Sequence, residues 1–268
     1  MQRIAILGAA GRMGRMLVAN TLRDSELKLT GAVEVAGSPF LGQDAGVVAG
    51  LAPCGVLITD SLAAAVRNAD AIIDFTAPTV AVANAKVAAA AGCAAVIGTT
   101  GLKDADRAAL AELAKSAKIV FAPNMSVGVN VLFHLCDKVT RLLGAEYDIE
   151  VVEMHHNQKK DAPSGTAERL GEILAKAANL DYKTDTRHGR EGLVGTRTKK
   201  EIGMHAVRGG DVVGDHTVIF ATQGERVELT HKASSRETFA KGALRASKFL
   251  AAAAPGKLYD MQDVLGLR

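Results

Sequence analysis

Tryptophan is absent from this sequence of 268 residues, and aromatic residues of all kinds make up 4% of it. Proteins that bind single-stranded nucleic acid stack the bases on aromatic side chains, and duplex-binding proteins usually carry a strong excess of positive charge. Here the net charge is only +3. We therefore expect no nucleic-acid partner, and any anion that the protein binds should be small.

Cysteine is also scarce. Cys54, Cys93 and Cys136 are widely spaced, odd in number and form no CxxC pair, which argues against a disulfide framework. We expect all three to be small, buried, apolar residues. The seven histidines form no HExxH motif and no Cys/His spacing typical of zinc, so the sequence predicts no metal site.

A long uninterrupted apolar run is the third absence. The most apolar segment, AKVAAAAGCAAVIG, is broken by Lys86 and two glycines, whereas a membrane helix needs roughly 20 apolar residues in succession. The first residues carry no basic region and no processing site, so we expect no signal peptide, no membrane span and a cytoplasmic protein. With 48% hydrophobic and 23% charged residues, the composition is typical of a globular protein.

Strand-like and helical segments alternate in the first half. Short apolar runs at 3–7, 27–34, 55–58, 71–75, 94–98 and 118–122 predict strands, and helices are expected from Arg12, over 79–91 and over 104–116. Parallel neighbours need crossover connections, so this order predicts a doubly wound, Rossmann-type parallel sheet in an α/β domain. We expect the domain to cover 1–126 and to be completed by 236–268, where a last helix at 237–254 returns to it.

The rhythm changes in the second half. Longer strand candidates lie at 147–156, 201–208, 215–222 and 225–232, with one clear helix, 164–178, between the first two. Such strands usually pair as an antiparallel or mixed sheet, so we predict a second, α+β domain over 127–235. Residues 183–200 show no periodicity and many basic side chains, which predicts a mobile basic loop.

A glycine-rich turn directly follows the first predicted strand. The segment GAAGRMGR, residues 8–15, has glycines at 8, 11 and 14. Glycines at such a turn let a pyrophosphate approach the backbone and let the helix pack closely on the strand. Glu34 lies 20 residues after Gly14, at the end of the second strand, where an acid accepts hydrogen bonds from an adenosine ribose. With the loops GTTG (98–101) and APNMS (122–126) at the same sheet edge, the turn predicts a dinucleotide site.

The segment HHNQKKDAPSGTA, residues 155–167, gathers two histidines, two lysines and an aspartate within thirteen residues. Ser164 and Gly165 open a predicted helix, whose first amides favour a carboxylate or phosphate. Lys159 and Lys160 add positive charge, and a histidine at 155 or 156 can transfer a proton near neutral pH. The simpler interpretation is a solvated basic loop. The alternative that we develop is a site for a small dianion.

Several motifs together resemble the dihydrodipicolinate reductase (4-hydroxy-tetrahydrodipicolinate reductase) family. They are GAAGRMGR, IDFTAP (73–78), VIGTTG (96–101), APNMSVGVN (122–130), HHNQKKDAPSGTA, AVRGGDVVGDHTV and GERVELTHKASSR. The resemblance covers nearly the whole chain. It implies an oxidoreductase of lysine and diaminopimelate biosynthesis that uses NADH, NADPH or both to reduce a cyclic unsaturated dicarboxylate to tetrahydrodipicolinate.

The resemblance also implies roles for particular residues. It makes His155 and Lys159 the catalytic pair that handles protons, and it places the substrate against His156, Gly165 and Thr166. It assigns cofactor binding to Gly8, Ala9, Ala10, Gly11, Arg12, Met13, Glu34, Gly98, Thr99, Thr100, Ala122, Pro123, Asn124 and Met125. It further implies a homotetramer formed through the sheet of the second domain, and hinges near 124–127 and 234–237.

Two other functions share parts of this pattern. A reductase of a phosphorylated aldehyde would have a similar first domain, but it normally needs a cysteine or tyrosine beside the substrate. A dinucleotide-binding redox sensor would need a basic recognition element, for which only 183–200 qualifies.

One departure from the family pattern concerns the cofactor: Val35 follows Glu34 where members that hold a 2′-phosphate often have arginine, although Arg12 offers a replacement charge. We therefore expect NADH to be used at least as well as NADPH.

Overall fold

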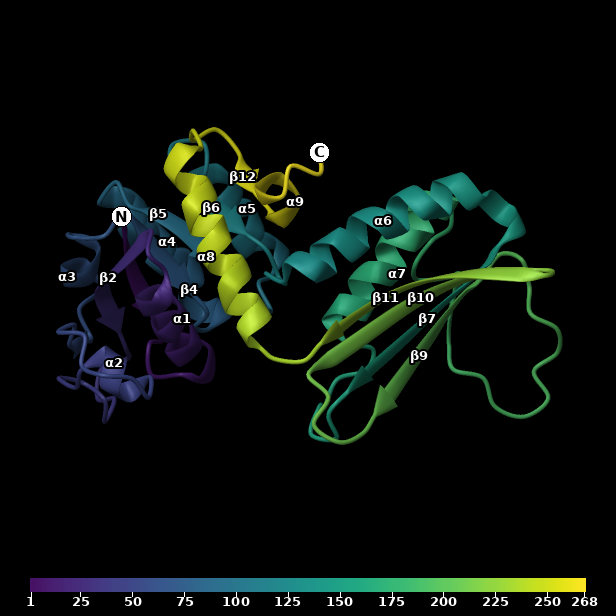
Figure 1. Cartoon of the computed structure of the whole chain (residues 1–268). Helices are drawn as coiled ribbons and strands as arrows, with labels where there is room; N and C mark the ends of the chain where they lie inside the picture. Colours follow the sequence, from purple (N-terminus) through teal and green to yellow (C-terminus); the bar gives the residue numbers. More distant parts are fainter. The chain divides into compact units, whose positions relative to one another are not determined.

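The computed structural model describes all residues, 1–268, and it divides into two compact units (Figure 1). Unit 1 comprises Met1–Val127 and Glu237–Arg268, and unit 2 comprises Gly128–Arg236. The chain passes from one unit to the other after Val127 and after Arg236, and the boundaries expected from the sequence lie after residues 126 and 235. The C-terminal segment therefore belongs to the same unit as the N-terminus.

Unit 1 is built on a parallel sheet of seven strands in the order β12-β6-β5-β4-β1-β2-β3. All six strand pairs are parallel, and the predicted Rossmann-type architecture is confirmed. The strands are β1 (Gln2–Leu7), β2 (Leu27–Val33), β3 (Ile58–Thr59), β4 (Ala71–Asp74), β5 (Ala94–Ile97), β6 (Ile119–Phe121) and β12 (Leu258–Tyr259).

Helices cover both faces of this sheet. They are α1 (Arg12–Arg23), α2 (Ala45–Val48), α3 (Leu62–Val66), α4 (Pro78–Ala90), α5 (Asp104–Leu113), α8 (Glu237–Ala252) and α9 (Met261–Val264). Successive side chains of a strand point to opposite faces. In β1, Ile4 and Ile6 therefore join the core beneath α1 and α8, while Ala5 and Leu7 join the core beneath α3, α4 and α5. A strand buried on both faces explains why its sequence is continuously apolar.

Unit 2 has a mixed sheet of five strands in the order β11-β10-β7-β9-β8. Its elements are α6 (Val127–Leu143), the short 3-10 helix η1 (Gly144–Glu146), β7 (Asp148–His155), α7 (Gly165–Ala178), β8 (Thr186–His188), β9 (Ile202–Arg208), β10 (Gly214–Thr222) and β11 (Glu225–Ala233). The strand β10 is antiparallel to β7 and β11, whereas β9 is parallel to β7 and β8. Figure 1 shows α6 and α7 along one face of the sheet, and their apolar side chains form one core with it. The predicted mixed sheet is confirmed.

Helix α6 is the largest element that the sequence did not predict. Its apolar positions, Val129, Leu132, Phe133 and Cys136, recur at helical spacing and are all buried. Three valines in its first five residues lower the helix propensity and imitate a strand. Burial of the apolar stripe in the core of unit 2 outweighs this local preference.

Three smaller expectations are also corrected. The third strand is Ile58–Thr59 rather than 55–58, because Gly55 adopts a positive φ of 79° and turns the chain just before it. Residues 183–200 are not irregular throughout, since Thr186–His188 pairs with β9. Cys54 is half-buried, whereas Cys93 and Cys136 are buried and burial raises the pKa of each thiol to about 12.

No helix in the structure has the length and apolar character that a membrane crossing requires.

Candidate active site

The end of β7 carries a buried carboxylate next to a buried histidine. Along β7, buried and half-buried positions alternate, so Glu153 and His155 lie on the same face of the strand, toward the helices. Glu153 is only 1% exposed and His155 8% exposed. The Nδ1 atom of His155 lies 2.6 Å from Oε2 of Glu153. This contact holds the imidazole in one orientation.

Arg208, the last residue of β9, neutralises the buried carboxylate. Its guanidinium donates to both oxygens of Glu153, over 2.8 and 2.9 Å, which is the two-pronged geometry that binds carboxylates most strongly. A further donation of 2.7 Å runs from Arg208 to the carbonyl oxygen of Asp161. The Asp161 side chain in turn pairs with the ammonium of Lys159 at 2.9 Å. Arg208 therefore links the end of the sheet to the segment that carries Lys159.

Ser164 connects the same cluster to α7. Its backbone N–H donates to Oε1 of Glu153 at 3.0 Å, and its hydroxyl accepts from the amide of Ala167 as the N-cap of the helix. The hydroxyl also lies 3.0 Å from Nε2 of His216 on β10. The rings of His155 and His216 meet edge to face, with centroids 5.2 Å apart. The start of α7 and the two imidazoles are thus fixed to one another by buried hydrogen bonds.

Burial and neighbouring charges set the protonation states of this cluster. Burial raises the pKa of Glu153, but hydrogen bonds from Arg208 and His155 outweigh it, so its pKa lies below the ordinary 4.5. Burial lowers the pKa of His155 below 6.5, although Glu153 opposes the shift. For His216, burial lowers the pKa to about 3. Near neutral pH the carboxylate is charged and both imidazoles are neutral.

The other residues predicted for the substrate site surround this cluster. His156 follows the last residue of β7 and is half-buried, and its N–H donates to the carbonyl of Val212 at 2.8 Å. Lys159 is half-buried and Lys160 is exposed, so the structure distinguishes the two lysines. Gly165 and Thr166 form the first turn of α7, with Gly165 exposed and Thr166 half-buried.

The predicted cofactor turn in unit 1 has the close packing that its glycines suggested. Gly8 adopts a positive φ of 69°, and its N–H and that of Ala9 both donate to the carbonyl of Val33. A Cβ on Gly14 would lie 1.9 Å from the carbonyl oxygen of Gly8, so only glycine lets α1 approach the turn. Gly11 is the N-cap and provides no side-chain acceptor, which leaves the first amides of the helix, from Arg12 and Met13 on, to face an anion.

Glu34 contacts the glycine turn directly. Its Oε1 accepts from the backbone N–H of Ala10 at 2.8 Å, and its Oε2 accepts from Val35 at 3.3 Å. The carboxylate is half-buried beside the turn, whereas Val35 is 73% exposed. Arg12 is also exposed. The turn is therefore bordered by a fixed negative charge.

The loops after β4 and β5 are joined by the buried carboxylate of Asp74. It accepts hydrogen bonds from the hydroxyls of Thr76 and Thr99, at 2.6 and 3.1 Å. The Thr99 side chain is 3% exposed and therefore shapes the loop, while Thr100 is exposed. A Cβ on Gly98 would lie 2.3 Å from the ring of Phe75, so this glycine too is required by packing.

The loop after β6 carries the last predicted cofactor residues. Ala122 and Met125 are buried, Asn124 is half-buried and Pro123 is exposed. A Cβ on Gly242 of α8 would lie 1.7 Å from the carbonyl oxygen of Met125. Helix α8 therefore supports this loop by close backbone packing.

Comparison with known proteins identifies the family. Residues 2–125 match the family model described as "Dihydrodipicolinate reductase, N-terminus", and residues 128–265 match the model described as "Dihydrodipicolinate reductase, C-terminus". The chain belongs to the dihydrodipicolinate reductase family. A 4-hydroxy-tetrahydrodipicolinate reductase of Citrifermentans bemidjiense is 51% identical over 100% of both chains. A reductase of the same name from Dechloromonas aromatica is 53% identical over 99% of this chain and 98% of the relative.

Solved structures of similar fold include a dipicolinate-bound dihydrodipicolinate reductase from Paenisporosarcina sp. TG-14. It has a TM-score of 0.76 and 24% identity, and the match covers 98% of each chain. An amine dehydrogenase from Mycobacterium smegmatis has a TM-score of 0.57 and 16% identity over 96% of this chain and 94% of that chain. At these identities the likeness supports the fold, with its dinucleotide-binding type of sheet and its second mixed sheet.

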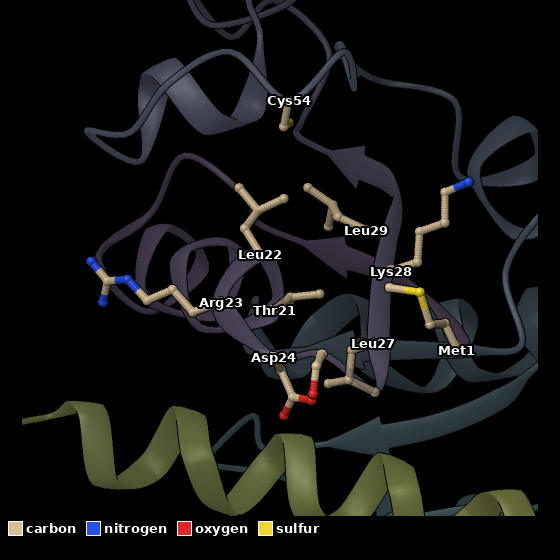
Figure 2. Close-up of a pocket in the computed structure, with 10 residues that line it drawn as sticks. Met1, Thr21, Leu22, Arg23, Asp24, Leu27, Lys28, Leu29 and Cys54 are labelled. Carbon is tan, nitrogen blue, oxygen red and sulfur yellow. The ribbon is translucent and has the colours of Figure 1, made fainter.

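Membership of the dihydrodipicolinate reductase family makes the chain an NAD(P)H-dependent oxidoreductase, and unit 1 fits such a cofactor. The glycine turn and the two loops described above all follow strand ends of one parallel sheet, where dinucleotides bind in folds of this kind. An open hollow lies elsewhere in unit 1, lined by residues at the starts of β1 and β2 and the end of α1, among them Met1, Thr21 and Leu29 (Figure 2). This hollow lies at the edge of the sheet where the strands begin, whereas the cofactor loops lie where the strands end, so its position does not fit a cofactor site.

Sequence reasoning for this reductase missed Glu153, Arg208 and His216. A signal for Glu153 was present, because residues two apart on a strand share a face and Glu153 precedes His155 by two. Arg208 is 55 residues from Glu153, and His216 is 52 residues from Ser164. Only strand pairing brings these groups together.

Proposed function

We propose that this chain uses the Glu153–His155 pair, Lys159 and the start of α7 to convert 4-hydroxy-tetrahydrodipicolinate into tetrahydrodipicolinate. The reaction replaces a hydroxyl group of the ring by hydrogen, so one hydride and one proton enter and one water leaves. Its place is lysine and diaminopimelate biosynthesis, and we propose the cytoplasm as its location. The buried contact between Glu153 and His155, beside the cationic segment 159–164, is the observation that carries this proposal.

The two basic side chains take different parts in the proton transfer. Near neutral pH His155 is neutral, because burial lowers its pKa, whereas Lys159 is a cation paired with Asp161. We assign proton donation to Lys159 and proton exchange at Nε2 to His155. His156 and the first turn of α7, with Gly165 and Thr166, bind the carboxylates of the substrate. The aldehyde reductase alternative loses support, because neither cysteine nor tyrosine occurs in this cluster.

The cofactor is held by unit 1 in this proposal. The pyrophosphate lies on the turn from Gly8 to Met13, and Glu34 accepts from the ribose. When bound, the nicotinamide supplies the hydride. The loops at 98–100 and 122–125 hold the remainder of the cofactor.

NADH is used at least as well as NADPH. Glu34 repels a 2′-phosphate, and exposed Val35 offers it neither charge nor hydrogen bond. Arg12, an exposed cation of the glycine turn, allows some use of NADPH.

A homotetramer is the assembly that we propose, formed through the sheet of unit 2. The face of this sheet that α6 and α7 do not cover carries Val152, Met154 and Val207, and Val207 is 42% exposed. Apolar groups on an uncovered sheet face favour association with a second copy. Light scattering of the purified protein measures the mass of the assembly and so tests whether it is a tetramer.

One assay tests the proposed reaction. Oxidation of NADH and NADPH is followed by absorbance with the product of dihydrodipicolinate synthase as substrate, and pyridine-2,6-dicarboxylate is added as a planar competitor. We expect turnover with both cofactors and competitive inhibition. A protein that binds NADH but shows no turnover with this substrate would contradict the proposal and favour a redox sensor.

A further inference from the structure

We propose that Glu153 is a positioning residue of the reaction, which fixes the tautomer of His155 and ties it to the start of α7. This inference rests on the proposed function, because it concerns the histidine that exchanges protons there. Glu153 does not need to touch substrate or cofactor to act in this way. Its influence passes through His155 and Ser164.

The hydrogen bonds of Glu153 decide which nitrogen of His155 carries the hydrogen. Three contacts to the carboxylate come from groups that can only donate: two from Arg208 and one from the amide of Ser164. An ionised carboxylate only accepts, so the fourth contact, from Nδ1 of His155 at 2.6 Å, must be a donation. The hydrogen of the neutral ring is therefore on Nδ1. Nε2 is left as the atom that exchanges protons with the reacting system.

The space at Nε2 supports this assignment. A Cβ on Gly214 would lie 2.9 Å from Nε2 of His155, so a side chain at this position would press on the working atom. Glycine adds no side chain next to Nε2. The ring is thus held at Nδ1 by Glu153, and no side chain at position 214 presses on Nε2.

Glu153 also fixes the segment that carries Lys159. The amide of Ser164 binds its Oε1, and Arg208 binds both the carboxylate and the carbonyl of Asp161. The chain between β7 and α7 is therefore fastened to one buried charge at its far end. Removal of that charge should disturb both the imidazole and the carboxylate-binding start of α7.

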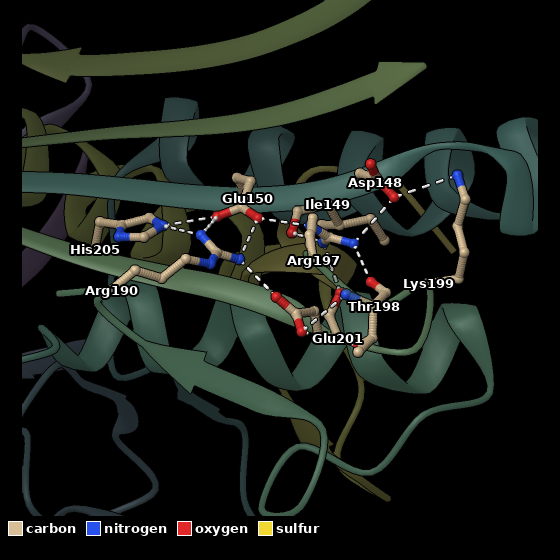
Figure 3. Close-up of polar contacts among 9 residues, drawn as sticks. All are labelled: Asp148, Ile149, Glu150, Arg190, Arg197, Thr198, Lys199, Glu201 and His205. Atoms are coloured by element: carbon tan, nitrogen blue, oxygen red, sulfur yellow. Dashed lines mark hydrogen bonds and ion pairs between the residues drawn. The ribbon is translucent and has the colours of Figure 1, made fainter. Parts of the chain in front are cut away.

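The opposite face of β7 offers a matched control. Like Glu153, Glu150 binds a histidine and arginine, here two arginines instead of one: Nε2 of His205 lies 2.7 Å from its Oε2, and Arg190 and Arg197 donate to it over 2.8 and 2.9 Å (Figure 3). The same kinds of groups therefore surround both glutamates. The Glu150 cluster lies on the half-buried side of the strand and makes no contact with His155.

The experiment compares Glu153→Gln with Glu150→Gln in the full-length enzyme. Nitrogen NMR of ring-labelled histidine, assigned with His155→Asn, reports the tautomer without any need for turnover. We expect Nδ1 of His155 to be protonated in wild type and in Glu150→Gln, and a mixture of tautomers in Glu153→Gln. The kcat of Glu153→Gln should fall by about 10²-fold or more, while its Kd for NADH is unchanged because the cofactor turn is in unit 1. Glu150→Gln should retain the wild-type kcat, with assembly checked by light scattering.

The pH profile of kcat provides an independent readout. The charged or titratable groups that face His155 are Glu153 on its own strand, Arg208 on β9, His216 on β10, and Lys159. Loss of the Glu153 charge removes the group that raises the pKa of His155, so the acid limb of the profile should move to lower pH. Glu153→Asp, which keeps the charge but shortens the side chain by one methylene and so draws the carboxylate away from Nδ1 of His155, should give an intermediate shift and covers the case in which Glu153→Gln does not fold.

The possible results separate the two proposals. A Glu153→Gln enzyme with wild-type kcat, pH profile and tautomer, altered only in thermal stability, would overturn the positioning role. If Glu153→Asp alone is measurable, an unchanged tautomer and pH profile would overturn it equally. Full activity in His155→Ala would instead contradict the proposed function, while the tautomer measurement on wild type would still report on Glu153.

Discussion

Protonation of His216 should make unit 2 markedly less stable in mild acid. His216 is 3% exposed, its Nε2 lies beside the hydroxyl of Ser164, and its Nδ1 has no hydrogen-bond partner. Burial, with a smaller contribution from the neighbouring His155, lowers its pKa to about 3. The folded protein therefore keeps this ring neutral over a pH range in which the unfolded chain binds a proton.

The sign and size follow from proton linkage. Between the unfolded pKa of 6.5 and the folded pKa of about 3, the unfolded state holds more protons, so the free energy of unfolding falls as the pH falls. With these two values, a change from about pH 7 to about pH 5 lowers it by about 2 kcal/mol through His216 alone. Above the unfolded pKa the contribution is fully present. The loss continues until the pH reaches the folded pKa.

Urea unfolding at these two pH values, followed by circular dichroism, measures the effect. His216→Gln has no titrating ring but can still bond to Ser164, so its free energy of unfolding should fall less than that of wild type, by about 2 kcal/mol. The comparison cancels the titration of His155 and of the carboxylates, which both proteins share. If both proteins lose the same free energy between the two pH values, then His216 does not titrate as described and the reasoning is refuted.

Three further predictions concern activity. Lys159→Ala should lower kcat by about 10²- to 10⁴-fold, whereas exposed Lys160 should matter little when changed to alanine; equal losses in steady-state assays would show that total charge is what counts. Val35→Arg should raise kcat/KM for NADPH relative to NADH at a fixed ionic strength, because the guanidinium can bind a 2′-phosphate, and an unchanged ratio would place the 2′-phosphate elsewhere. Gly14→Ala should weaken NADH binding at least about tenfold in a fluorescence titration, because its Cβ would lie 1.9 Å from the carbonyl oxygen of Gly8 and force α1 away from the turn. An unchanged affinity would show that the turn is not part of the cofactor site.

Local patterns were sufficient for the first unit. A continuously apolar strand such as β1 is a direct consequence of burial on both faces, and strands that alternate with helices permit little besides a parallel doubly wound sheet. The glycines at 8 and 14 indicate a tight turn, because no larger residue fits at Gly14, where the backbone of α1 comes close to the backbone of Gly8. The fold class and the position of the turn can therefore be predicted from residues that are neighbours in the sequence.

The second unit needed tertiary information. Helix α6 has a valine-rich start that favours a strand locally, and only its packing against the sheet makes it helical. Likewise, Arg190 and Arg197 were assigned from composition to a mobile basic loop, but their side chains are held by Glu150. A basic segment is indistinguishable from a solvated loop until its acidic partners on another strand are known.

The sequence by itself brought together the groups that we propose carry the chemistry, since His155, Lys159 and the start of α7 lie within one short segment, residues 155–167. The tertiary structure alone decided their states. Glu153 reaches Arg208 through the pairing of β7 with β9, and Ser164 reaches His216 on β10, across separations of 55 and 52 residues. The protonation state of a side chain depends on its burial and on the charges that surround it in the folded protein, and neither can be read from the residues next to it in the sequence.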